Sequence, residues 1–167
     1  MKRTIRGTLI SLLAFGLFWS YAHGRQTLLP QNEIKNLEKS GHLIPAGKDT
    51  WKTPKGLILK GRDPKGQTRL EHIMRHTRDM PRRKKHGVFS VSRAEVINLM
   101  DQTWLAVKSG RLRGKARGGN VAYTYRLRKE VGYLGGQEGA RKGHPKLNAV
   151  RMVLREGTSE VITFFPF

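Results

Sequence analysis

The hydrophobic residues change their spacing along this 167-residue chain, and this change restricts its fold more than any other feature. In residues 92–108 the large apolar side chains recur every three or four positions, which is typical of a helix with one buried face; they are Ile97, Met100, Trp104 and Val107. In residues 121–128 apolar and polar side chains alternate, which is typical of a strand with one wet face. We therefore predict an α+β fold with N-terminal helices packed on a roughly four-stranded antiparallel sheet.

The remaining elements are predicted from the same patterns together with the positions of glycine and proline. Ser92 begins the longest helix as the first residue of a Ser-x-x-Glu capping motif. Two more helices are expected at 30–39 and 67–77, and further strands at 57–59, 131–134, 147–155 and 160–165. The stretches 47–56, 110–120 and 135–146 are expected to be loops, and the last two are rich enough in cations to contact a phosphate backbone.

Charge and the lack of cysteine limit the class of protein. The chain has 33 Lys and Arg against 12 Asp and Glu, a formal net charge of +21. Such an excess predicts a polyanionic partner, either nucleic acid or an anionic surface, although a merely solvated basic surface is the plainer alternative. Because the sequence has no cysteine, disulfides, thiolate metal sites and thiol nucleophiles are excluded.

The first residues have the composition of an export signal. Three cations, Lys2, Arg3 and Arg6, precede an uncharged apolar stretch, and small residues around Gly24 suit cleavage. The stretch is short for a membrane span of roughly 20 residues, so a signal peptide at 1–24 is favoured over an uncleaved N-terminal anchor. In either case we expect a secreted or periplasmic protein, with no stable membrane association if the leader is cleaved.

Removal of the three leader cations leaves 30 basic residues against 12 acidic ones, a net charge of +18 that belongs to the mature part. About 140 residues remain, which suffices for one core. We expect an N-terminal helix and linker at 25–56 and the main domain at 57–167.

Three histidines lie within fifteen residues of one another. His72 and His76 belong to the helix expected at 67–77, where they share a flank away from its apolar side, and His86 follows a loop rich in cations. One histidine on a helix flank is more often a surface residue than a catalytic one. Three close together beside cations make a catalytic role as plausible as a surface position, because imidazole acts as a general base or acid near neutral pH.

Four segments of the chain, taken in order, resemble one known group of proteins. They are LEHIMRHTRD at 70–79, HGVF at 86–89, YTYRLRKEVGYLGGQEG at 123–139 and EVITFFPF at 160–167. Together they resemble the barnase–EndoU–colicin–RelE-like ribonuclease superfamily, in particular the EndoU/CdiA-type domains of bacterial toxins. The resemblance covers roughly residues 57–167 and implies helices followed by a four-stranded antiparallel sheet, and cleavage of RNA without a metal. It implies a catalytic set of His72, His76, His86 and Thr163.

Cleavage of RNA by its own 2′-hydroxyl needs a base, an acid and positive charge around the phosphate. The basic loop and the strand at 121–128 are expected to provide the contacts with the substrate. Tyr125 could stack a base, although the alternation in this strand equally suits packing of Tyr123 and Tyr125 in the core. The candidate substrate-binding residues are Arg82, Lys84, Lys85, Thr124, Tyr125 and Arg126.

The function predicted from the sequence is therefore an exported, metal-independent endoribonuclease that needs no cofactor. Its predicted partner is RNA, and an acidic inhibitor or immunity protein is the expected protein partner of so basic an enzyme. The main alternative is a non-catalytic basic module that binds nucleic acid or polyanions of the cell envelope.

A third alternative is a zinc hydrolase. His72 and His76 have the i, i+4 spacing that can bind zinc, with His86 or Asp79 as a third ligand. The Glu precedes the first His, however, so the metalloprotease motif H-E-x-x-H does not occur here. We therefore predict no metal site.

Overall fold

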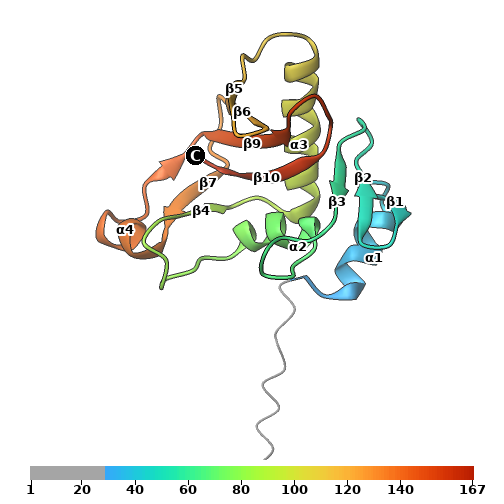
Figure 1. Ribbon diagram of the computed structural model, residues 1–167. Coiled ribbons are helices and arrows are strands. Elements are labelled where there is room, and N and C mark those ends of the chain that lie inside the picture. Colours follow the sequence, from blue (N-terminus) through green and yellow to red (C-terminus); the bar gives the residue numbers. More distant parts are fainter. Residues whose placement is uncertain (1–28) are drawn as a thin grey trace, which may run out of the picture.

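The computed structural model describes residues 29–167, so the leader expected at 1–24 lies outside the described residues. This part of the chain contains four α-helices and three antiparallel sheets, which confirms the α+β class (Figure 1). Two details of the prediction are wrong: the helices do not all precede the strands, and the strands form several sheets rather than one.

The bounds of the elements are as follows. The helices are α1 (Gln31–Lys39), α2 (Arg69–Met74), α3 (Arg93–Lys108) and α4 (Gly136–Arg141), and one 3₁₀ turn, η1 (Arg75–Thr77), continues α2. The strands are β1 (Ile44–Gly47), β2 (Thr50–Lys52), β3 (Ile58–Lys60), β4 (His86–Phe89), β5 (Lys115–Arg117), β6 (Asn120–Arg126), β7 (Gly132–Gly135), β8 (Lys146–Leu147), β9 (Ala149–Arg155) and β10 (Val161–Pro166). Of the helices described here, none has the length and hydropathy to cross a membrane.

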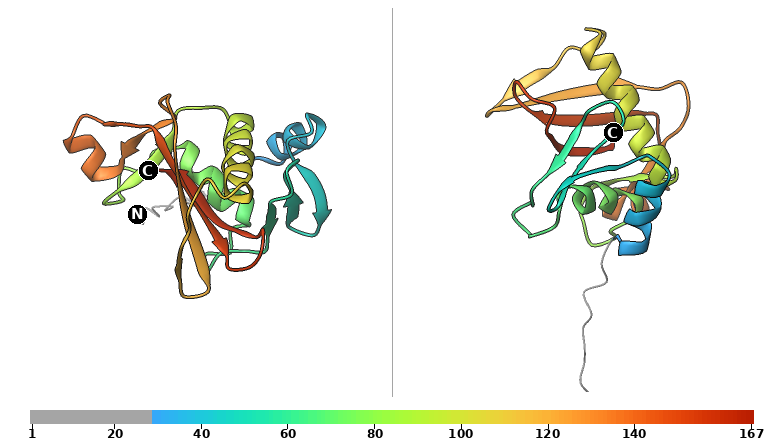
Figure 2. Two further views of the ribbon diagram at one scale, coloured as in Figure 1. Left: turned by 90° about the horizontal axis from the view of Figure 1, so that it is seen from above. Right: turned by 90° about the vertical axis from the view of Figure 1, so that its right-hand side faces the viewer.

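The largest sheet has the strand order β10-β9-β6-β5, and all of its neighbouring strands are antiparallel. Helix α3 crosses one face of this central sheet (Figures 1 and 2). Ile97 and Met100 of the helix share a buried cluster with Met152 of β9 and Phe164 of β10. The tyrosines of β6 pack against this cluster, so the alternation in β6 serves the core on its apolar side.

The N-terminal elements are connected to the same core. Ile34 and Leu37 of α1 are buried, as the pattern at 30–39 predicts, and both belong to the core cluster. The Thr53 hydroxyl donates a hydrogen bond to the carboxylate of Asp101, a buried residue of α3. Residue 58, at the start of β3, also forms a bridge with Glu160. The small sheet β1-β2-β3 is therefore fixed to both α3 and the central sheet.

All three predicted loops contain regular structure. The stretch 47–56 includes β2, the stretch 110–120 includes β5, and the stretch 135–146 includes α4. Strand β5 has only three residues and no apolar alternation, and it forms because β6 folds back on it as a hairpin. The composition of these stretches predicts loops because such short elements carry no periodicity of their own. They form by pairing or packing with neighbouring segments.

Candidate functional site

A cleft of about 580 Å³ lies beside α2, β4 and β10. All four predicted catalytic residues are among those that line it: His72, His76, His86 and Thr163. Four cations line the same cleft, namely Arg75, Arg83, Lys85 and Arg151. No Asp or Glu of the described residues does so. The cleft therefore combines imidazoles with unbalanced positive charge, which suits an anionic ligand.

His72 is held in one tautomer by a buried carboxylate. Its Nδ1–H donates to Asp63 Oδ2 over 2.8 Å, and the Asp63 side chain is only 4% exposed. Arg75 Nη2 lies 3.2 Å from the same Nδ1, but an arginine only donates, so this close contact cannot also be a hydrogen bond. Because Nδ1 carries the proton, Nε2 is left as an acceptor. It accepts from the Thr163 hydroxyl, with 3.3 Å between Nε2 and Oγ1.

The pKa of His72 lies below its ordinary value. Burial of the ring is the largest cause, the hydrogen bond to Asp63 opposes it, and the nearby charge of Arg75 lowers the pKa further. His72 is therefore neutral at physiological pH, with an unprotonated Nε2 that accepts from Thr163. This is the state that a general base requires.

Asp63 is fixed by the turn in which it lies. Its Oδ1 accepts hydrogen bonds from the backbone N–H of Lys65 and of Gln67, which is the pattern of an Asx turn. Burial alone would raise the pKa of Asp63, but the hydrogen bonds from His72 and from the backbone outweigh it and hold the pKa below its usual value. One carboxylate thus closes the turn with one oxygen and orients His72 with the other.

A β-bulge directs Thr163 into the cleft. Val161 pairs with Leu154 and Thr163 pairs with Val153, so Ile162 is an extra residue in β10. In a regular strand, residues two apart point to the same face. Val161 is buried, yet Thr163 faces the cleft, because the extra residue shifts the alternation.

His76 lies deeper than the sequence predicts. The α-helix ends at Met74 and η1 follows, so His76 turns inward and is only 8% exposed. Its Nδ1–H donates to Gly87 O over 2.8 Å. Its ring stacks between His86, with centroids 4.6 Å apart, and Phe165, with centroids 5.4 Å apart. Burial lowers the pKa of His76 to about 3, so the ring is neutral.

His86 supports the site rather than facing a ligand. Its Nε2–H donates to Arg78 O over 3.0 Å, and its Nδ1 is buried with no hydrogen-bond partner in the described residues. Neither nitrogen can therefore exchange a proton with a ligand in the cleft. Burial also lowers the pKa of His86 below its ordinary value. We assign to His86 the role of a neutral ring on which His76 stacks.

The predicted substrate-binding residues are divided between two places. Lys85 lines the cleft, whereas Arg82 and Lys84 are exposed and line neither this cleft nor the neighbouring groove described next. Thr124, Tyr125 and Arg126 line that groove.

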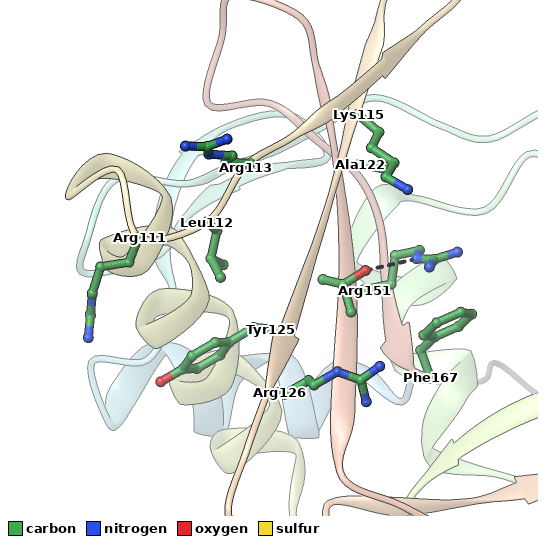
Figure 3. Close-up of a pocket in the computed structure, with 10 residues that line it drawn as sticks. Arg111, Leu112, Arg113, Lys115, Ala122, Tyr125, Arg126, Arg151 and Phe167 are labelled. Carbon is green, nitrogen blue, oxygen red and sulfur yellow. Dashed lines mark hydrogen bonds between the residues drawn. The ribbon is translucent and has the colours of Figure 1, made fainter.

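The second hollow, of about 780 Å³, lies across β5, β6 and β9 and is called the hairpin groove below. Five cations line it: Arg111, Arg113, Lys115, Arg126 and Arg151 (Figure 3). Figure 3 shows Tyr125 on the opposite side of β6 from Arg126 and Phe167, which agrees with its packing against the core. Two residues, Arg151 and Phe167, line both the groove and the cleft.

Sequence reasoning missed three residues that shape the cleft: Asp63, Arg75 and Arg151. Asp63 lies nine residues before His72, but the run Asp63-Pro64-Lys65-Gly66 has a turn composition that could have indicated a fixed carboxylate. Arg75 is only 6% exposed and donates to Gln67 Oε1 over 2.9 Å, although the helix pattern places it on the surface. Nothing in the local sequence distinguishes Arg151 from the other arginines.

In the described residues, no group of three or more His, Asp or Glu side chains is placed so that it could hold a metal ion. The i, i+4 pair of the zinc alternative is split, since His72 turns toward Asp63 and His76 toward Gly87.

Comparison with known proteins adds no assignment. No protein-family model, curated protein or solved structure matches this chain. The function must therefore be argued from the site itself.

Proposed function

We propose that this protein is an exported, metal-independent endoribonuclease in which His72 is the general base. The observation that supports this most is the Asp63–His72–Thr163 chain of hydrogen bonds, which presents a neutral imidazole nitrogen to a cationic cleft. The resemblance of residues 57–167 to ribonuclease domains of bacterial toxins points to the same chemistry.

In the proposed reaction a ribose 2′-hydroxyl takes the place of the Thr163 hydroxyl and donates its proton to His72 Nε2. The 2′-oxygen attacks phosphorus, the bond from phosphorus to the 5′-oxygen breaks, and a 2′,3′-cyclic phosphate forms. Arg75 and Lys85 face the negative charge that develops on the phosphoryl oxygens, and the Thr163 hydroxyl is free to donate to one of them.

The departing 5′-oxygen must gain a proton. His76 is the second imidazole of the cleft with a nitrogen not used by the fold, since Nδ1 alone is bonded to the backbone. With a pKa of about 3, His76 is neutral in the free protein and its Nε2 carries no proton. A bound phosphate raises the pKa of a nearby imidazole, so the acid role of His76 depends on the substrate. Otherwise water supplies this proton.

The purified protein incubated with RNA in EDTA tests this function. We expect fragments that end in 2′,3′-cyclic phosphate, and no cleavage of DNA of the same sequence, because DNA lacks the attacking hydroxyl. Cleavage that EDTA abolishes, or equal cleavage of RNA and DNA, would contradict the proposal.

The second candidate is a basic binding module that does not cleave its ligand. The burial of His76 favours it, because a ring stacked between His86 and Phe165 also serves as ordinary packing. RNA bound but left intact by the wild-type protein, with the same affinity in a His72→Ala variant, would favour this module.

A further inference from the structure

One face of the central sheet connects the proposed catalytic cleft with the hairpin groove. Residues that pair across a sheet point to the same face. Thr163 of β10 pairs with Val153 of β9, and Val153 pairs with Ala122 of β6, which pairs with Lys115 of β5. These four paired residues therefore lie on one face of the central sheet, and this face extends from the cleft to the groove.

A second line of paired residues carries the groups that both hollows share. Phe165 of β10 pairs with Arg151 of β9, and Arg151 pairs with Thr124 of β6. Arg151 Nε donates to the Thr124 hydroxyl over 3.4 Å, drawn as the dashed line in Figure 3. The guanidinium lies over the ring of Phe167, 3.5 Å from its centroid. These contacts fix Arg151 at the junction of the two hollows.

The charges on this face are not neutralised by neighbours. Lys115 and Arg126 are exposed, and Figure 3 shows both on the same side of β6 as Arg151 and Phe167. No Asp or Glu of the described residues lines the groove. Lys115 pairs with Ala122 of β6, Arg151 pairs with Thr124, and Arg126 lies two residues further along β6. The three cations therefore follow one another along the strand direction in steps of two residues, about 7 Å each, so their long side chains can contact successive phosphates of one strand.

The ring of Phe167 adds an aromatic surface to this row of cations. Phe167 is 43% exposed, one of few large apolar side chains in the described residues to be so open. An unpaired base can stack on such a ring, whereas a base inside a duplex cannot reach it. Cations in a row together with an open aromatic ring are the combination that binds single strands.

We propose that the hairpin groove binds single-stranded RNA beyond the scissile phosphate, with phosphates at Arg151, Lys115 and Arg126 and an unpaired base on Phe167. The choice of RNA as the ligand rests on the proposed function. The groove adds the substrate class, which is an unpaired strand several nucleotides long. Arg151 lies between the cleaved phosphate and the next one.

Binding to a non-cleavable probe tests the groove separately from catalysis. The probe is a single-stranded oligoribonucleotide of about ten nucleotides with 2′-O-methyl groups, a length within the usual range for such sites. The groove variant Lys115→Ala/Arg126→Ala is compared with the control Lys35→Ala/Lys39→Ala, which removes the same charge from exposed positions on α1.

We expect the groove variant to bind the probe more weakly by about tenfold or more. The slope of log K against log salt should become shallower by about 1.3 to 1.5, because two phosphate contacts are lost and each contributes about 0.7 for a single strand. The control should stay near the wild type. Equal loss of affinity in both variants would overturn the proposal, because it would show that only net charge matters.

The aromatic contact has its own variant. Phe167→Ala should weaken binding of the single-stranded probe about tenfold, whereas Phe167→Trp should bind it as the wild type does. Neither variant should change the binding of a duplex of the same length. Equal losses for duplex and single strand would overturn the assignment of an unpaired base to Phe167.

The outcomes separate the two proposals. Groove-dependent binding without any cleavage of natural RNA would remove the endoribonuclease and leave the groove standing. Cleavage of a long RNA that is unaffected in the groove variant, together with unchanged probe binding, would remove the groove and leave the enzyme.

Discussion

At the scale of single residues, the site depends on which nitrogen each histidine has left for a ligand. His72 donates its Nδ1–H to the Asp63 carboxylate, and His76 donates its Nδ1–H to the carbonyl of Gly87. His86 instead donates its Nε2–H to the carbonyl of Arg78. Of these three histidines, only His72 is held by a carboxylate, and its other nitrogen accepts a hydrogen bond from the Thr163 hydroxyl at the cleft. The three histidines that look equivalent in the sequence therefore have different surroundings, and we expect different roles for them.

The first prediction concerns His72 and its orienting carboxylate. His72→Ala should lower kcat/KM for RNA by about 10²-fold or more, the scale of general acid–base catalysis. Asp63→Asn should lower kcat more than it changes KM, because the amide can favour the wrong tautomer. Initial rates with a fluorogenic RNA substrate measure both effects. His42→Ala is the control, since the ring of this histidine is hydrogen-bonded to Ser40 at the surface, away from the cleft; an equal loss there would contradict the assignment.

The second prediction is the pH dependence of the rate. The base must be unprotonated, so kcat/KM rises as pH increases through the pKa of His72. Burial and the charge of Arg75 place this pKa below its ordinary value. We expect the ascending limb to lie below about 6.5, the value for free imidazole. A profile measured from acid to neutral pH shows the limb, and a midpoint well above 6.5 would exclude His72 as the base.

The third prediction follows from the buried rings. His76 has its folded-state pKa lowered to about 3, so the unfolded chain binds a proton that the folded chain does not. The free energy of unfolding should therefore fall as the pH decreases from about 6.5 toward about 3, because the unfolded state gains that proton. Urea denaturation at pH values across this window measures the fall. His76→Phe removes the titration, so its stability should depend less steeply on pH; an unchanged slope would show that other groups account for it.

At the scale of the elements, β4 and β10 approach so closely at Gly87 that no side chain fits at this position. A Cβ at Gly87 would lie 2.2 Å from Pro166 O, a backbone atom that cannot turn aside. This approach lets the carbonyl of Gly87 meet His76 and places β10 next to the cleft. Glycine is needed at this position for space, not for its backbone angles.

The fourth prediction tests that approach. Gly87→Ala should lower the free energy of unfolding by about 1–3 kcal/mol, the usual cost of overpacking, and should also reduce activity because His76 loses its fixed partner. Chemical denaturation gives the first value. The control is Ser90→Ala, just past the same strand at an exposed position. A stable and active Gly87→Ala variant would show that the two strands can separate without cost.

The sequence predicts long elements well and the site only in part. Helices α1 and α3 and strands β6, β9 and β10 lie close to the predicted stretches, because each is long enough to show its period. Strands β2 and β5 have three residues each and are set by their partners. The position of His76 depends on a change from α-helix to 3₁₀ turn, and the partner of His72 lies in a turn; neither follows from helical periodicity.

At the scale of the whole molecule, positive charge gathers where carboxylates do not. Both the cleft and the hairpin groove are lined by cations alone among their charged residues within 29–167. The chain carries a net charge of +21. The cations of the cleft and the groove therefore attract polyanions, and they also repel one another within the fold.

The fifth prediction follows from this repulsion. Raising NaCl from about 20 mM to about 200 mM shortens the range of charge interactions to roughly a strand spacing or two, so the Tm should rise. Thermal denaturation measures the change. Lys115→Glu/Arg126→Glu should raise the Tm at low salt and make it less sensitive to NaCl. A Tm that falls with salt in the wild type would mean that ion pairs, not repulsion, dominate.

The bulge at Ile162 has a consequence for how this protein can evolve. Before the bulge Val161 is buried, and after it Thr163 and Phe165 line the cleft while Phe164 is buried in the core. Exchanging Thr163 for another side chain leaves the core undisturbed, whereas Phe165 stacks on the buried ring of His76 and is less free to change. Deleting Ile162 would remove the bulge and leave a regular strand in which Val161 and Phe164 still face the core and Thr163 the cleft, so this segment should tolerate the loss of one residue at the bulge.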